Sequence, residues 1–448
     1  MRSAGFLALA CGLLLSACAT YAPAPPHTAQ FPAAYDARRL DPKPPGAEWT
    51  GADLLSAALT RNPQIIAARA KYVAALAAAR AAKAAPGPSL TLTAEYAREA
   101  PHWGYSGGVD LPLDYGAQRS TRINTANLQA LQAFYDYGEA IWSVRVAIDK
   151  ARIDMLWSAR ESRSAAEAVQ VRVDRLKRIQ DRIAAGEDAR AVGLAAQADL
   201  ATAERRRYAA LGRENSSRVD LAAALGVSRN ALLDVRVAPL TLEEAWPKNI
   251  YAWRPAAALS RRDVLKAVAD YDIAENALRL EVAKQYPQVS LGPAYNYDHG
   301  VTKLPFSLSL ALPPWDLNRG AIAKAEADRA AAGRALEAAQ AGVLAAVDAA
   351  LEAESRARQD LDRVRAHSLP VAQKTDADLV RSTAAGQTDR VDELAARGAM
   401  IDVYLDMLDA QRAAMTAAVD REDALRRAGD PAETAVIETA LTDVGGVR

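Results

Sequence analysis

Two pairs of short segments in this chain alternate apolar and polar residues at every second position. The pairs span residues 88–113 and 287–313. A period of two predicts β-strands with one apolar and one polar face. The predicted apolar faces comprise Leu90, Leu92, Ala94, Tyr96, Tyr105, Gly107, Val109, Leu111, Val289, Leu291, Pro293, Tyr295, Phe306, Leu308, Leu310 and Leu312.

Each predicted strand has about ten residues, the length of a tilted strand that crosses a bilayer. Aromatic residues near both strand ends are typical of membrane interfaces. A soluble sheet with one wet face is the alternative. That sheet would need a helix over its apolar side, and no short amphipathic helix adjoins these segments in the sequence. The pattern therefore favours strands that face lipid.

Most of the remaining sequence has the period of an α-helix. Helical stretches at about 52–84 and 261–284 precede the strand pairs, and a very long one covers about 118–185. Pro370 predicts a kink or interruption in the second long helix, because proline lacks the backbone N–H that the helix uses. A coiled-coil seam is predicted at Val391, Leu394, Gly398, Ile401, Leu405 and Leu408.

Both long helices break at similar sequences, with Gly186 in one and Gly386 in the other. Glycine followed by polar residues predicts a turn and the start of a returning helix. Helix, strand pair and long helical hairpin follow in the same order in both halves, which predicts an internal duplication. The predicted units are a first repeat at 51–240, a second repeat at 241–430 and a C-terminal tail at 431–448.

The N-terminal residues have the pattern of a bacterial lipoprotein signal peptide. A short apolar core leads to Leu15-Ser16-Ala17-Cys18, which predicts a signal peptide at 1–17 and acylation, palmitate included, at Cys18. An ordinary signal peptide with an incidental cysteine is the alternative. Ala19 stands where an Asp would favour the inner membrane, so we expect the outer membrane. Residues 18–50 are rich in Pro and Ala and predict an extended tether.

Composition excludes several classes of function. Lys and Arg together number 55, as do Asp and Glu, so nothing indicates a nucleic-acid partner. After removal of the signal peptide the only cysteine is Cys18, so no disulfide is expected. The histidines are scattered, and no metal site is predicted. No catalytic or nucleotide-binding motif occurs, so we expect no enzyme and no cofactor other than the lipid on Cys18.

Four strands are too few to close a barrel, and an open sheet edge cannot exist in hydrocarbon. Identical subunits must therefore share their strands. Two chains would give eight strands and a filled interior, whereas three would give twelve strands and a lumen.

At the strand-to-helix turns stand LPLDYG (residues 111–116) and LPPWDLNRG (residues 312–320), and Arg61-Asn62-Pro63 lies early in the first helical stretch. With these motifs and the AAG breaks, the chain resembles the outer-membrane efflux proteins, the TolC-like outer membrane factors, in their lipid-anchored form. The resemblance implies a membrane α+β fold: a homotrimer with a twelve-stranded β-barrel, four strands per chain, continued by a long periplasmic α-helical coiled-coil barrel. It further implies an outer-membrane exit duct for an inner-membrane pump, joined through a periplasmic adaptor protein. Our first hypothesis for this pump is the RND type.

In the family, the helical tips around the glycine breaks meet the adaptor and close the duct. The resemblance carries this role to Gly186, Glu187, Asp188, Gly386, Gln387 and Thr388. Acidic residues beyond the glycine often ring the entrance. Here Asp392 lies six residues after Gly386, but Val192 lies six after Gly186, so the implied ring comes from one half only.

Asp389 and Glu393 would assist this ring, and Arg390 would hold the closed state by pairing with a neighbouring acid. The alternative for Asp392 and Arg390 is a solvated helix face.

The WDLNRG turn looks like that of heavy-metal efflux members, and export of drugs is an equally open possibility. The exit duct of a type I protein secretion system is a second possibility, and a lipid-anchored periplasmic coiled-coil spacer without a pore is a third.

Overall fold

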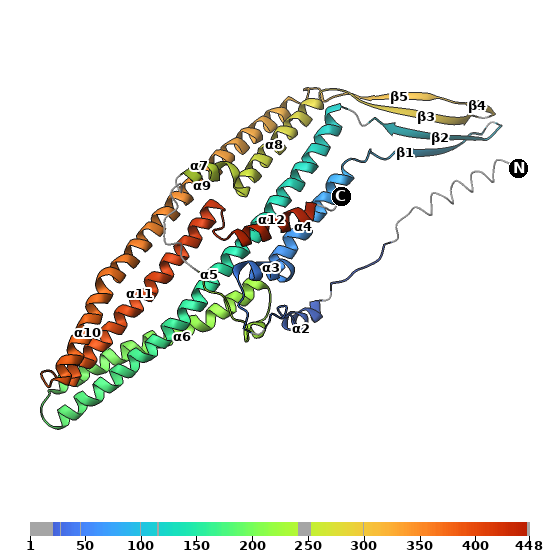
Figure 1. Ribbon diagram of the computed structural model, residues 1–448. Helices are drawn as coiled ribbons and strands as arrows, with labels where there is room; N and C mark the ends of the chain where they lie inside the picture. Colours follow the sequence, from blue (N-terminus) through green and yellow to red (C-terminus); the bar gives the residue numbers. More distant parts are fainter. Residues whose placement is uncertain are drawn as a thin grey trace.

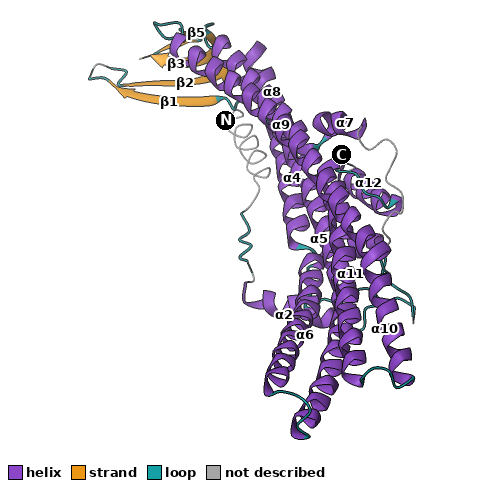
Figure 2. Cartoon of the chain, turned by 90° about the vertical axis from the view of Figure 1, so that its left-hand side faces the viewer, coloured by secondary structure: helices purple, strands orange, loops and turns teal. Residues whose placement is uncertain are grey.

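The computed structural model describes residues 21–26, 28–44, 46–98, 100–113, 116–240, 252–298 and 300–445. The chain is a long rod (Figure 1). Its strands lie at one end, and the turns of two helical hairpins lie together at the other (Figures 1 and 2). The main helices are α3 (Gly51–Arg61), α4 (Pro63–Ala81), α5 (Gly116–Ala184), α6 (Arg190–Leu225), α7 (Trp253–Ser260), α8 (Arg262–Ala283), α9 (Arg319–Arg363), α10 (Leu369–Ala384), α11 (Arg390–Leu425) and α12 (Pro431–Gly445).

The strands form one antiparallel sheet. They are β1 (Ser89–Tyr96), β2 (Trp103–Pro112), β3 (Gln288–Asp298), β4 (Val301–Lys303) and β5 (Phe306–Ala311). β2 pairs with β1 and β3, and β3 also pairs with both β4 and β5. β4 and β5 together take the place of the predicted fourth strand. They are separated at Leu304 and Pro305, because proline has no N–H to donate to the ladder.

The register places the predicted apolar residues on one face of the sheet. Leu92 lies opposite Gly107, Gly107 opposite Tyr295, and Leu291 opposite Leu308. Residues directly opposite each other on neighbouring strands project from the same face. The sheet is therefore apolar on one side and small or polar on the other.

The long helices form two antiparallel hairpins. α5 runs for 69 residues before it turns back into α6 at Gly186. In the second half a π-helical turn at Val364–Ser368 divides α9 from α10. Pro370 lies in the first turn of α10, where its missing N–H costs least. The interruption predicted from this proline is thus present, just before it.

The helical stretch predicted at 52–84 is divided into α3 and α4, whereas the stretch predicted at 261–284 is the single helix α8, preceded by the short helix α7, which was not predicted. Asn62 separates α3 from α4 and accepts hydrogen bonds from the backbone N–H groups of Gln64 and Ile65. Its carboxamide also donates to the carbonyl of Ala224 at 2.7 Å. Arg261 separates α7 from α8 and donates to the carbonyl of Ala424 at 2.7 Å. Both breaks therefore attach to the last turn of a returning helix.

Residues 28–50 do not form the predicted extended tether. A 3₁₀ turn (Thr28–Gln30) leads into the short helix α2 (Phe31–Asp36). The hydroxyl of Tyr35 donates to the carbonyl of Val227 at 2.8 Å, and Arg38 donates to the carbonyls of Arg61 and Gly226. The prediction is wrong here because these side chains find partners at the end of α6. The signal peptide and Cys18 lie outside the described residues.

The core occupies the middle of the rod and neither end. Leu54 and Leu55 of α3, Ile141 of α5, Leu221 of α6 and Leu405 of α11 are fully buried there. The C-terminal segment predicted as a tail contains α12, whose Ile437 and Ala440 join this core. Among the described residues, no helix combines the length and the apolar composition that crossing a bilayer requires.

Candidate functional site

The apolar face of the sheet is bare in the single chain. Leu92 is 74% exposed, Leu308 59% and Leu312 79%. Exposed apolar surface on this scale marks a contact with lipid or another protein, because leaving it in water is unfavourable. Thr91, Thr93 and Ser309 lie on the opposite, polar face. The sheet therefore presents an exposed apolar face on one side and a polar face on the other.

Aromatic side chains gather at the loop end of the first two strands. The rings of Tyr96 and Trp103 lie 5.1 Å apart, and those of Trp103 and Tyr105 lie 6.1 Å apart. Amphipathic rings of this kind settle at the boundary between hydrocarbon and water. At the helix end, Trp315 is fully exposed. Tyr115, the aromatic residue at the corresponding turn after β2, lies outside the described residues.

The two hairpin tips have the same backbone turn. Gly186 and Gly386 have φ values of 80° and 72°, which side chains other than glycine rarely adopt. After each glycine the backbone N–H of the next residue donates back into the last helical turn at 2.9 Å, from Glu187 to Arg182 and from Gln387 to Ser382. This is the Schellman arrangement that ends a helix. It presents Glu187 and Gln387 to solvent at the end of the rod.

One arginine joins the two tips. Arg182, in the last turn of α5, contacts the carboxylate of Asp389 on the other hairpin. It also contacts Asp188 of its own tip, with Nε 2.9 Å from Oδ2. The guanidinium offers donors on two edges, so one side chain can hold both carboxylates. The sequence analysis missed Arg182. The signal available in the sequence was a basic residue four positions before Gly186, close to acidic residues of the predicted tips.

The other gate candidates take different places. The carboxylate of Asp389 also caps α11 by accepting from the N–H of Val391. Arg390 pairs with Glu393 on its own helix, where Glu393 is buried. Asp392 is exposed in the first turn of α11. The structure thus brings Asp389 to Arg182 and Arg390 to Glu393, and leaves Asp392 apart from both pairs.

A buried cluster of charges fixes α12 to the middle of the rod, and the sequence analysis also missed it. Nε of Arg145 lies 2.7 Å from the carboxylate of Glu433, and Nη1 of Arg152 lies 2.9 Å from that of Asp149. Glu422 also contacts Arg145. These residues come from α5, α11 and α12, so the cluster ties three helices together. Nothing local in the sequence reveals which of its many arginines and acids would be buried.

The balance of charge in this cluster shifts the pKa values of its members. Burial raises the pKa of Asp149. Burial, followed by the nearby charge of Asp149, raises the pKa of Glu433 to about 7. Burial alone would lower the pKa of Arg145, but the carboxylates around it, from Asp149 and Glu422 among others, raise it above its ordinary value. A cluster with more carboxylates than guanidinium groups favours holding a proton on one carboxyl group.

A second buried pair lies between α9 and α11. Nε of Arg421 lies 3.0 Å from the carboxylate of Glu354, which also contacts Arg358. Breaking such a pair leaves an uncompensated buried charge, so both partners are needed for these helices to pack. Among the described residues, no three side chains of the types that bind metals gather into a site.

We compared the sequence and the fold of this chain with those of known proteins. Residues 54–227 match the family model described as "Outer membrane efflux protein". No curated protein matches the sequence. The fold, in contrast, has solved counterparts.

A membrane protein from Pseudomonas aeruginosa is 19% identical, with a TM-score of 0.71, 86% of this chain covered and 91% of that one. The outer membrane protein VceC from Vibrio cholerae is 17% identical, with a TM-score of 0.70 and coverage of 85% and 97%. The CmeC outer membrane channel of Campylobacter jejuni is 13% identical, with a TM-score of 0.70 and coverage of 94% and 98%. The resemblance to the outer membrane efflux proteins is thereby confirmed at two levels: residues 54–227 match the model of that family, and most of the chain has the fold of solved outer membrane proteins such as VceC and CmeC.

Proposed function

We propose that this protein is the outer-membrane exit duct of a tripartite efflux system and passes substrates from an inner-membrane pump, through a periplasmic adaptor, to the outside. One observation carries the proposal. A single chain exposes a sheet with a complete apolar face, while in the described residues β1 pairs only with β2 and β5 only with β3. Three chains that pair these edges would close a twelve-stranded barrel with a lumen.

The polar face of the sheet would line that lumen, and the apolar face would contact lipid. The long hairpins would continue the wall into the periplasm as a helical coiled-coil barrel. The buried seam of α11, with Leu394, Ile401 and Leu405 packed inward, supports helices that associate side by side. A lipid on Cys18 would add an anchor in the outer membrane.

The tips around Gly186 and Gly386 would be the adaptor-contacting surface and the periplasmic gate. The exposed carboxylate of Asp392 is available for a ring of three acids at the entrance, which would attract cations. The contact between Arg182 and Asp389 would hold the two hairpins of each chain together when the gate is closed. An RND-type pump is the partner proposed for this duct, with heavy metals or drugs as its cargo.

Reconstitution of the full-length protein in a planar bilayer tests the duct. We expect ion-conducting pores and a cross-linked trimer. Asp392→Asn should weaken the preference for K⁺ over Cl⁻, measured as a smaller reversal potential in a salt gradient. Asp378→Asn is the matched control, because Asp378 lies on α10 near the same tip and pairs locally with Arg381. A protein that stays monomeric and never conducts would be a spacer and would refute the proposal.

A further inference from the structure

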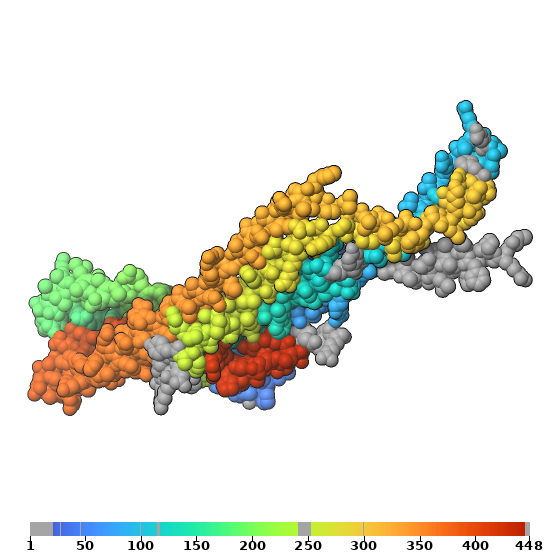
Figure 3. Space-filling model, turned by 90° about the horizontal axis from the view of Figure 1, so that it is seen from above, coloured from blue at the N-terminus to red at the C-terminus, as the bar shows by residue number. Residues whose placement is uncertain are grey.

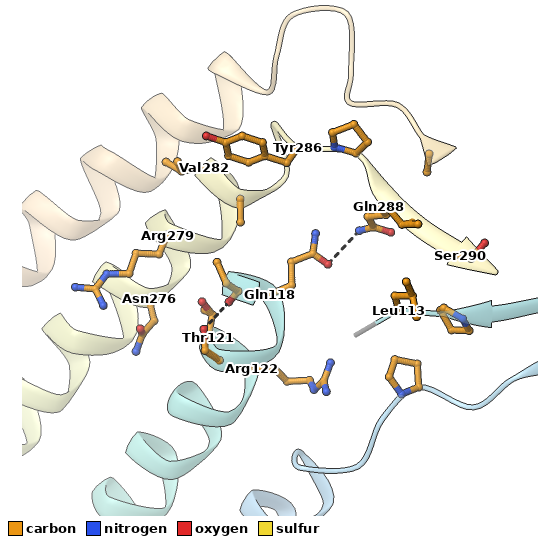
Figure 4. A pocket seen from close by; sticks show the side chains of 18 of the residues that line it. Leu113, Gln118, Thr121, Arg122, Asn276, Arg279, Val282, Tyr286, Gln288 and Ser290 are labelled. Atoms are coloured by element: carbon orange, nitrogen blue, oxygen red, sulfur yellow. Dashed lines mark hydrogen bonds between the residues drawn. The ribbon is translucent and has the colours of Figure 1, made fainter. Parts of the chain in front are cut away.

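A cavity of about 810 Å³ opens where the sheet meets the helices. Figure 4 shows it between the first turns of α5, the last turns of α8 and the adjoining ends of β2 and β3. Its volume is within the range of pockets that hold drug-sized molecules. In the space-filling view this is the region where the thick helical body narrows toward the strands (Figure 3).

The cavity lies on the polar face of the sheet. Its lining includes Pro112, Ser290 and Ser309, which are cross-strand partners in succession. Because paired residues share a face, the cavity is on the side opposite Leu308 and Leu310. In the proposed duct that side is the lumen, at the passage from the helical barrel into the strand barrel.

Part of the wall is apolar, although the surface is a water-facing one. Leu113, Val282 and Tyr286 line the cavity, and the last two are 41% and 71% exposed. Apolar side chains are unfavourable on a channel wall that contacts only water. Together they form a surface on which the apolar body of a molecule can pack.

Two buried polar side chains line the same cavity. Asn276 of α8 is 6% exposed and Thr121 of α5 is 4% exposed (Figure 4). In the described part of the chain, neither side chain has a hydrogen-bonding partner. Their polar atoms are not among the fully enclosed ones, so they remain open to the cavity, where they can hydrogen-bond to water or to a ligand. Gln118 and Gln288 hydrogen-bond to each other at 3.2 Å across the cavity edge and join the helix to the strand.

The charges around the cavity balance. The lining contains two acidic residues, Asp110 and Glu275, and two arginines, Arg122 and Arg279. Nε of Arg279 lies 3.3 Å from the carboxylate of Glu275, and Arg122 donates to backbone carbonyls at the end of α4. The lining carries no net charge, so an ionic ligand would lose hydration without an excess of opposite charge to compensate for the loss. The site is therefore suited to an uncharged ligand.

We propose that this cavity is a transit site for uncharged, amphipathic organic molecules of drug size, with the apolar body on Leu113 and Val282 and polar groups on Asn276 and Thr121. The inference rests on the proposed duct, which places the site in the lumen. It assigns the cargo to organic compounds and not to metal ions.

The test measures binding to the full-length trimer in lipid nanodiscs by equilibrium dialysis. The probe is radiolabelled chloramphenicol, a neutral and water-soluble aromatic amide, and empty nanodiscs give the background. Its anionic succinate ester has the same body and should bind at least about tenfold more weakly. Val282→Trp fills the cavity and should weaken chloramphenicol binding about tenfold or more, whereas Asn276→Leu removes a hydrogen-bonding group and should weaken it several-fold.

Val268→Trp is the matched control. Val268 lies on the same helix, is 38% exposed and does not line the cavity, so binding should stay within about twofold. Equal binding by the two tryptophan variants, or binding no greater than that of empty nanodiscs, would overturn the site. Conductance is measured on the same samples. A pore that conducts but does not bind refutes only the transit site, and a protein that binds but does not conduct refutes only the duct.

Discussion

Arg182 at the tip of one helical hairpin contacts Asp389 at the tip of the other, across 207 positions of sequence. The two side chains are 35% and 40% exposed, so each contact is worth no more than about 0.5–1 kcal/mol. Three such contacts in a trimer would together shift a closed-to-open equilibrium roughly tenfold to a hundredfold. In the proposed duct, such a link would be strong enough to hold a gate closed and weak enough for an adaptor to release it.

Arg182→Ala should therefore raise the basal conductance of reconstituted pores by up to about tenfold to a hundredfold. Single-channel recording in planar bilayers measures the open probability directly. Arg175→Ala is the control, because Arg175 pairs with Asp199 inside one hairpin, with Nη1 3.1 Å from Oδ2. If both variants conduct like the parent protein, Arg182 is not a gate contact.

The two faces of the sheet should respond differently to a positive charge. Leu92→Lys puts an ammonium group on the lipid-facing side, at a cost of about 2–4 kcal/mol near the middle of the bilayer. Thr93→Lys puts the same group one residue away, on the polar side. We expect the first variant to lose heat-resistant trimers in outer-membrane fractions and the second to keep them. Equal loss would mean that the exposed apolar face does not meet lipid.

The buried cluster around Glu433 makes the attachment of α12 depend on pH. The pKa of Glu433 is raised to about 7 in the folded protein, from an ordinary value of 4.5. The folded state then binds the proton more tightly than the unfolded state does. The resulting stability is fully present below about pH 4.5 and is lost as the pH rises through about 7.

Hydrogen exchange in α12, corrected for the intrinsic effect of pH, should therefore be slower at pH 6 than at pH 8. Glu433→Gln keeps an oxygen for Arg145 but cannot titrate, so the difference should shrink. Glu438→Gln changes an exposed carboxylate of the same helix and should leave it intact. A pH difference that persists in Glu433→Gln would assign it to another group of the cluster, such as Asp149.

Gly226 should be indispensable for packing the end of α6 against the junction between α3 and α4. It has φ of 72°, and a Cβ atom added there would lie 2.4 Å from the carbonyl oxygen of Arg61. Gly226→Ala should thus destabilise the fold by at least about 2 kcal/mol and lower the thermal midpoint followed by circular dichroism. Gly212→Ala, on the same helix with open space around it, should instead stabilise it by about 0.5–1 kcal/mol. Similar midpoints for the two variants would contradict this reading of the turn.

Much of the local structure could be predicted from short patterns. The period of two placed the strands, glycine with polar neighbours placed both tips, and Pro370 predicted the interruption that appears as a π-helical turn. Each signal acts over a few residues, because strand alternation, turn geometry and the missing proline N–H are properties of the backbone nearby. The break at Asn62 and the helix α7 before Arg261 were not predicted, since the partners of Asn62 and Arg261 lie at the ends of α6 and α11.

By itself, the sequence determined which residues share a face, where the chain turns and that one chain has too few strands to close a barrel. Only the tertiary structure decided which distant groups meet. It paired Arg182 with Asp389, folded the supposed tail into α12 around Glu433, and set Asn276 and Thr121 against one cavity. The physical reason is range: alternation and turn chemistry depend on neighbouring residues, whereas burial, charge pairing and cavities depend on surfaces that come together only when the helices pack.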